Sequence, residues 1–188
     1  MATVQKPQTS RRATIRDLYR VEGRAELVNG RILKMSPVGR QHSRIAKRIM
    51  LSLTAYEQVI RNGEAFTDNV AFLARLPNRR SFSPDVSYYN GPPPADPAGF
   101  LPEPPIFAVE VRSRSDAGRA GEKRMKASRA DYFAAGTKVV WDVDPIKEIV
   151  RVYRATKLDE PTVYQIGQVA DAEPALAGWR MSVAEIFA

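Results

Sequence analysis

The 188-residue sequence contains no cysteine and only one histidine. Without cysteine, the chain forms no disulfide bond, has no cysteine nucleophile and builds no thiolate zinc site. One histidine alone cannot complete a zinc ligand set either. The sequence also lacks a phosphate-binding P-loop and a GxSxG nucleophile elbow, which excludes the enzyme classes that depend on those motifs.

Long apolar runs are absent as well, so no segment is predicted to span a membrane. The first residues, MATVQKPQTSRRATIRD, have no apolar stretch after their charges and do not resemble a secretory signal. We therefore expect a cytoplasmic protein. The length and the 44% hydrophobic content predict a flexible N-terminus over residues 1–12 and a single domain over residues 13–188.

Positive charge is concentrated in one third of the chain. Residues 1–63 contain 13 Lys or Arg and 4 Asp or Glu, whereas residues 64–188 contain 16 and 17. A localised basic surface favours a polyanion such as nucleic acid, because basic side chains near phosphates release condensed counterions. On charge alone, a basic surface without a partner is an equally good interpretation.

Local patterns predict a mixed α/β (α+β) fold. Asn29-Gly30 separates two short apolar runs and predicts a hairpin with strands at 25–28 and 31–35. Apolar residues recur every three or four positions from about 41 to 61, which predicts a long helix with a basic outer face. A short helix is expected from Ala13.

The second half of the chain alternates strands and helices. Seven prolines fall between positions 92 and 105, which predicts a surface loop. A strand at 105–112 and a helix at 118–135, closed by Gly136, follow this loop. Two more strands, a last strand in PTVYQIGQV and a short helix in WRMSVAEIF complete a central mixed sheet flanked by helices.

Two acidic residues occupy similar places in this pattern. Asp85 follows a proline before an apolar run, and Glu110 ends the run IFAVE about 25 residues later. On neighbouring strands the two carboxylates would converge. Carboxylate oxygens suit Mg²⁺, which keeps several waters and binds substrate phosphates. Taken singly, Asp85 is better explained as a turn residue, and Glu110 as the ion-pair partner of Arg112 or of a neighbouring arginine. Taken together with the basic flank, the two acids favour a functional site.

The motifs SPDVSYY, IFAVEVRSRSD and RADYFAAGTKVVWDVDP, preceded by AELVNGRILKMSPVGRQHSRIAKRI, resemble the Uma-type restriction endonuclease family. This family is part of the PD-(D/E)XK nuclease superfamily, and the resemblance covers about residues 19–154. It implies a restriction-endonuclease-like core, with a central mixed sheet and helices on both sides.

The resemblance also implies roles for individual residues. Asp85 and Glu110 would bind the metal together with the carbonyl of Val111. Glu26 matches an acid that the family places near the same site. His42 matches a histidine at the start of the long helix, where it would contact a phosphate or form a structural hydrogen bond.

One position departs from the superfamily pattern. Arg112 stands where the superfamily has lysine, and arginine can bind phosphate but cannot serve as a base. Related sequences place a lysine in the following helix at the position of Ser128. Either Arg112 is sufficient, or Lys126 reaches the site after a local shift, or this chain has lost turnover. Arg129 is one position out of register.

The leading hypothesis is a Mg²⁺- or Mn²⁺-dependent endonuclease that cleaves phosphodiester bonds in DNA. Arg112 would stabilise the phosphate charge, and Arg44 and Lys47 would position the DNA backbone. Cutting both strands of a duplex makes a homodimer plausible. The alternatives are a catalytically impaired nucleic-acid-binding module and a purely structural domain. Asp142 and Asp144, on one strand face before Pro145, are interpreted as strand-end and turn residues and not as a second metal site.

Overall fold

A six-stranded mixed sheet forms the centre of the computed structural model, which describes residues 11–67 and 69–188. Its strands lie in the order β10 (Lys157–Gln165), β9 (Ile149–Arg154), β8 (Val139–Asp144), β7 (Phe107–Val111), β6 (Val86–Tyr89) and β3 (Glu64–Thr67). Strands β7 and β8 are parallel, and every other neighbouring pair is antiparallel.

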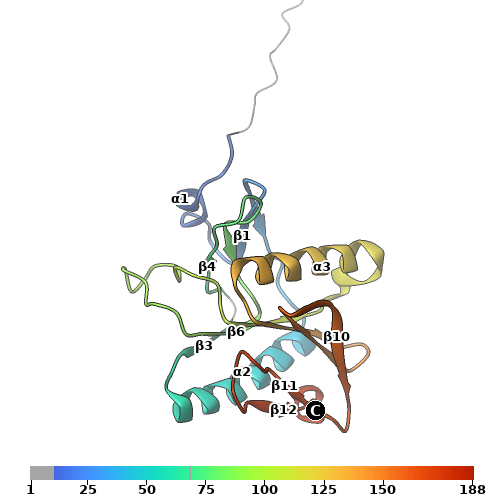
Figure 1. Cartoon of the computed structure of the whole chain (residues 1–188). Coiled ribbons are helices and arrows are strands. Elements are labelled where there is room, and N and C mark those ends of the chain that lie inside the picture. The colour runs from blue at the N-terminus through green and yellow to red at the C-terminus, as the bar shows by residue number, and fades with distance from the viewer. Residues whose placement is uncertain (1–10, 68) are drawn as a thin grey trace, which may run out of the picture.

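Helices cover both faces of this sheet (Figure 1). One face carries the long helix α2 (Arg40–Ile60), the short helix α4 (Val183–Phe187) and the small sheet of β11 (Val169–Asp171) and β12 (Arg180–Ser182). The other face carries α3 (Gly118–Ala135), which follows a 3-10 turn at Arg114–Asp116. This arrangement confirms the predicted fold class.

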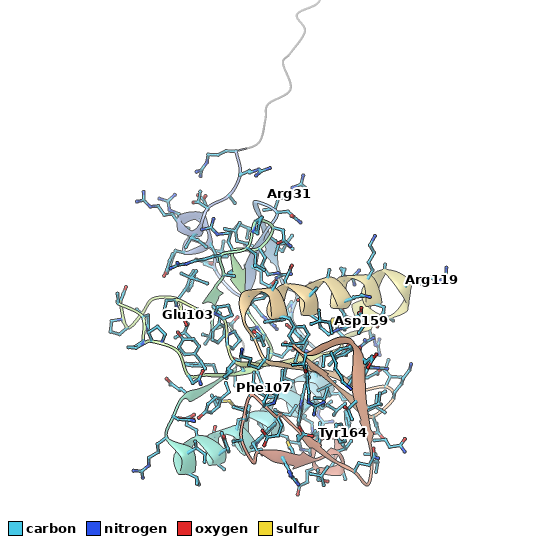
Figure 2. The ribbon with its side chains drawn as sticks, in the orientation of Figure 1. Arg31, Glu103, Phe107, Arg119, Asp159 and Tyr164 are labelled. Carbon is cyan, nitrogen blue, oxygen red and sulfur yellow. The ribbon has the colours of Figure 1, made fainter. Side chains whose placement is uncertain are left out.

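Alternating strand residues form a core on each side of the sheet. In β7, Val109 and Val111 pack with the α2 stripe predicted from its period, whereas Ala108 packs with Tyr132 of α3. Phe107, which is labelled in Figure 2, belongs to the same core as Val109 and Val111. Successive residues of a strand point to opposite faces, so Glu110 belongs to the same face as Ala108.

A smaller unit lies beside α3. It contains α1 (Ile15–Leu18), the β1–β2 hairpin (Ala25–Val28 and Arg31–Lys34) and the two-stranded sheet of β4 (Phe72–Leu73) and β5 (Ser81–Phe82). The predicted hairpin is confirmed, and both Asn29 (φ 51°) and Gly30 (φ 71°) adopt the positive φ angles that such a turn needs. Leu18, Ala25 and Leu27 form a separate apolar cluster here.

Some boundaries differ from the predictions. Helix α1 is shorter than expected, and β10 begins four residues before Pro161 with a register shift near this proline. An edge strand tolerates a residue that lacks a backbone N–H. Of the predicted flexible segment 1–12, residues 1–10 lie outside the described part, whereas Arg11 pairs with Asp17.

The proline-rich segment 92–105 forms the predicted loop, and it is attached to the smaller unit. Tyr19 stacks on Phe100 with ring centroids 3.8 Å apart, and its hydroxyl accepts a hydrogen bond from the backbone N–H of Phe100. Leu101 bridges to Phe72. These contacts therefore hold in place the loop that connects β6 to β7.

Candidate active site

Asp85 and Glu110 lie on neighbouring antiparallel strands, as the sequence predicted. Asp85 immediately precedes β6, and its backbone N–H donates to the carbonyl of Val109. In the opposite direction, the N–H of Val111 donates to Asp85 Oδ2 at 2.6 Å. The carboxylate of Asp85 is thus fixed against the end of β7, next to the peptide unit that joins Glu110 to Val111.

Two basic side chains contact Asp85, which is only 3% exposed. Arg24 Nη1 donates to Oδ1 at 2.5 Å, and His42 Nε2 lies 3.1 Å from Oδ2. Burial alone would raise the pKa of Asp85, but the hydrogen bond to His42 and the charge of Arg24 together lower it below the usual value. Asp85 is therefore an ionised carboxylate at neutral pH.

The environment of Glu110 raises the pKa of its carboxyl group, whereas that of Asp85 lowers it. Burial raises the pKa of its carboxyl well above the usual value, and the negative charges of Asp85 and Glu26 raise it further. Tyr132 of α3 donates its hydroxyl proton to Glu110 Oε1 at 2.8 Å. The accumulated negative charge shows that Asp85, Glu26 and Glu110 interact, and a cation placed among them would relieve their repulsion.

Glu26 reaches this site from the β1–β2 hairpin. Its Oε1 accepts the backbone N–H of Ser83 at 2.9 Å, and its Oε2 accepts a hydrogen bond from Arg79. Arg79 also donates to Asp131 of α3. These contacts orient Glu26 toward the chain that leads into Asp85.

The oxygen donors around Asp85 are of the chemical kind that Mg²⁺ prefers. Among the described residues, no three histidine, cysteine or acidic side chains are arranged to hold a metal ion by themselves. Mg²⁺ nevertheless needs only one or two carboxylates, because waters and substrate phosphates complete its octahedron. Asp85, Glu110 and the carbonyl of Val111 are hard oxygen donors of this kind, with Glu26 nearby. Arg24 occupies Asp85 Oδ1, so a metal ion at that oxygen would displace its guanidinium.

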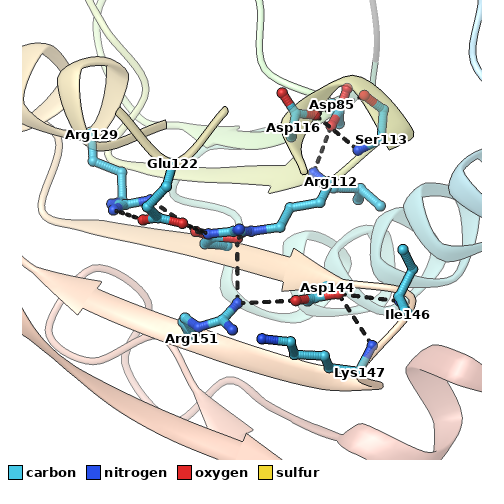
Figure 3. A network of polar contacts seen from close by, with 12 residues as sticks. Asp85, Arg112, Ser113, Asp116, Glu122, Arg129, Asp144, Ile146, Lys147 and Arg151 are labelled. Atoms are coloured by element: carbon cyan, nitrogen blue, oxygen red, sulfur yellow. Dashed lines mark hydrogen bonds and ion pairs between the residues drawn. The ribbon is translucent and has the colours of Figure 1, made fainter. Parts of the chain in front are cut away.

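Arg112 does not contact Glu110 in this structure. It donates to both oxygens of Asp142, at 2.5 and 2.7 Å, and to Glu122 at 2.7 Å (Figure 3). This pairing with Asp142 raises the pKa of Arg112 above its usual value. The Glu110–Arg112 ion pair considered from the sequence is therefore not formed, because Asp142 lies in register with Glu110 on the parallel strand β8 and receives the guanidinium instead.

The strand-end interpretation of Asp142 is wrong. Asp142 is 0% exposed within β8, and Arg129 of α3 donates to it at 2.8 Å while also pairing with Glu122. Arg129 lies over the ring of Tyr153 at 4.1 Å. The turn interpretation of Asp144 is confirmed, since its side chain accepts two backbone N–H groups of the following turn.

The other predicted residues lie apart from the paired acids. Lys126 is exposed on α3 and pairs with Asp159 of β10 at 2.8 Å (Figure 2). Arg44 and Lys47 are exposed on α2, and Arg44 donates to the carbonyl of Ala188. They project about 200° and 140° around the helix from His42. The structure thus brings together Glu26, His42, Asp85, Glu110 and Val111, but not Arg112, Lys126, Arg44 or Lys47.

Sequence reasoning did not identify Arg24 and Tyr132 as members of the site. Arg24 precedes Glu26 by two positions, and the alternation of side chains along a strand could have placed both on one side. Tyr132 carried a weaker signal, because an aromatic residue on an amphipathic helix is usually assigned to the core. Its ring does pack in the core, stacked on Phe82 at 4.2 Å, while its hydroxyl reaches Glu110.

The fold and the paired acids agree with the restriction-endonuclease type that the sequence motifs indicated. A family model described as "Uma2: Putative restriction endonuclease" matches residues 13–184. The chain therefore belongs to the Uma2 family, as the sequence motifs indicated.

A solved structure shares this fold. It is the crystal structure of a putative nuclease belonging to DUF820 from Anabaena variabilis, with a TM-score of 0.76 and 18% sequence identity. The match covers 93% of the present chain and 97% of the other. No curated protein matches the sequence. In residues 11–67 and 69–188, no helix is long and apolar enough to cross a membrane.

Proposed function

We propose that the protein is a metal-dependent endonuclease that hydrolyses phosphodiester bonds in DNA. The observation that carries this proposal is the meeting of Asp85 and Glu110 at the adjoining ends of β6 and β7, beside the Val111 peptide. Family membership and the nuclease named for the similar structure support it.

Asp85, Glu110 and the Val111 carbonyl would hold Mg²⁺ or Mn²⁺, with Glu26 close to the same position. A bound divalent ion polarises the phosphodiester and lowers the pKa of a coordinated water. His42 keeps the Asp85 carboxylate oriented, and Tyr132 does the same for Glu110. A homodimer would present two such sites to the two strands of a duplex.

Nicking of supercoiled plasmid tests this function. With Mg²⁺ or Mn²⁺ the wild-type protein is expected to convert plasmid to open circles, and Asp85→Asn to lower the rate about 100-fold or more, since metal-ion stabilisation contributes several kcal/mol. Asp159→Asn makes the same chemical change on the surface and should retain full activity. Equal rates for wild type and Asp85→Asn would refute the proposal.

The pairing of Arg112 and Lys126 with other acids favours a second candidate, a nucleic-acid-binding module that does not cleave. This candidate predicts DNA binding that weakens steeply with salt concentration. Binding measured by fluorescence anisotropy at two salt concentrations, without nicking by the wild-type protein, would favour it over the endonuclease.

A further inference from the structure

Two basic residues, Arg24 and His42, contact Asp85, and of these the Arg24 guanidinium remains charged at every working pH, whereas Arg112 is paired with Asp142. Arg24 Nη1 lies 2.5 Å from Asp85 Oδ1, and Nε donates to the carbonyl of Ser83 at 3.0 Å. Asp85 lies opposite the end of β7 that carries Glu110, so the guanidinium is held beside the acid pair through its contact with Asp85.

The basic residues considered for the lysine position of the superfamily are engaged elsewhere. Arg112 and Arg129 share the buried carboxylate of Asp142. Lys126 pairs with Asp159 on the surface. Moving Arg112 to the paired acids would break its bonds to a carboxylate that is fully enclosed, which is costly.

We propose that Arg24 supplies the positive charge that contacts the substrate phosphate, the role for which the sequence suggested Arg112. This inference rests on the proposed nuclease function. In the metal-free protein, the guanidinium occupies the Asp85 oxygen that a divalent ion would take. A divalent ion bound at that oxygen would displace the guanidinium, which would then be free to contact the phosphate.

Open space borders the side chain of Arg24. Its side chain is 13% exposed and borders a cavity of about 360 Å³, which is also lined by Tyr19, Ala25, Ser83 and Phe100. A guanidinium presents two parallel N–H groups to phosphate oxygens and remains protonated. In the hydrolysis, the water oxygen bonds to phosphorus, the P–O bond to the departing oxygen breaks, and that oxygen receives a proton from the water. Arg24 stabilises the phosphate charge and gives up no proton.

Mn²⁺ affinity and nicking rate, measured on the same full-length variants, test this role. Arg24→Gln removes the competitor for Asp85, so isothermal titration calorimetry is expected to show Mn²⁺ binding about tenfold tighter. The nicking rate should fall about 100-fold at saturating Mn²⁺. If Arg24 only stabilises the fold, Arg24→Gln should lower both the Mn²⁺ affinity and the nicking rate. Arg154→Gln removes the same charge from the pair with Asp171 and should change neither.

Arg24→Lys provides a second variant that retains the charge. Its compact ammonium cannot reproduce the contacts of a guanidinium, so both Mn²⁺ affinity and nicking rate should lie between wild type and Arg24→Gln. Unchanged or weaker Mn²⁺ affinity in both Arg24 variants overturns the proposal, as does tighter binding with a wild-type nicking rate.

The same titrations separate this inference from the proposed function. If Asp85→Asn abolishes Mn²⁺ binding while the Arg24 variants bind like wild type, only the assignment of Arg24 fails. If wild-type protein binds no Mn²⁺, or Asp85→Asn binds it equally well, the proposed function fails and the role of Arg24 fails with it.

Discussion

Replacing Asp142 by asparagine is expected to destabilise the protein severely, although Asp142 lies outside the paired acids. Its carboxylate is 0% exposed and receives hydrogen bonds from Arg112 and Arg129, whose side chains are 14% and 6% exposed. An amide leaves both guanidiniums enclosed with only Glu122, which is half exposed, as a counter-charge. Breaking a buried ion pair by removing one partner costs about 3–5 kcal/mol.

The magnitude can be compared with a surface pair of the same length. Lys126 and Asp159 lie 2.8 Å apart with side chains 64% and 71% exposed, and such a pair contributes at most about 1 kcal/mol. For a chain of this size, a loss of 3–5 kcal/mol lowers Tm by about 6–20 °C, whereas Asp159→Asn should lower it by about 4 °C at most.

Urea unfolding followed by circular dichroism measures this difference directly. Asp142→Asn should shift the midpoint strongly, and Asp159→Asn serves as the matched control. A free energy of unfolding for Asp142→Asn within about 1 kcal/mol of wild type would refute the assignment of Arg112 to a structural network. It would also reopen the role of Arg112 at the phosphate.

Three further substitutions test the electrostatics of the site in metal-free buffer. The raised pKa of Glu110 stabilises the fold below pH 4.5, and this stability is lost as the pH rises through the raised value; Glu110→Gln should therefore unfold at a higher temperature than wild type at pH 9 but not at pH 4.5. The lowered pKa of Asp85 stabilises the fold above pH 3.8, so Asp85→Asn should unfold at a lower temperature than wild type at pH 7, and equal values would contradict the contacts with Arg24 and His42. Tyr132→Phe removes the hydroxyl donor of Glu110 and should cost about 1–2 kcal/mol in urea unfolding, whereas no change would show that this hydrogen bond is unimportant.

Sequence reasoning succeeded where the signal is local. The turn at Asn29-Gly30 and the end of α3 at Gly136, which has a φ of 113°, depend on residues that tolerate positive φ. The pairing of Asp85 with Glu110 was also predictable, since two strands joined by one loop are commonly neighbours.

The direction of Arg112 could not be predicted in this way. It depends on Asp142, which reaches the same face only after α3 has crossed over to form the parallel strand β8. The approach of Arg24 to Asp85 likewise depends on how the hairpin packs against the segment around Ser83, 59 residues away. The spacing of apolar residues identifies neither Asp142 as the partner of Arg112 nor Asp85 as the partner of Arg24. It predicts which face of a helix or strand is buried, but not which element packs against that face.

The division of the site between the central sheet and the β1–β2 hairpin affects how it can open. Asp85 and Glu110 belong to the central sheet, whereas Arg24 and Glu26 belong to the hairpin unit with its own small apolar cluster. Units with few apolar contacts undergo local opening at lower free energy than a central core. A transient opening of the hairpin would withdraw Arg24 and Glu26 together and leave the other two carboxylates in place. Access to Asp85 and Glu110 would then depend on the local stability of the hairpin and not on that of the central sheet.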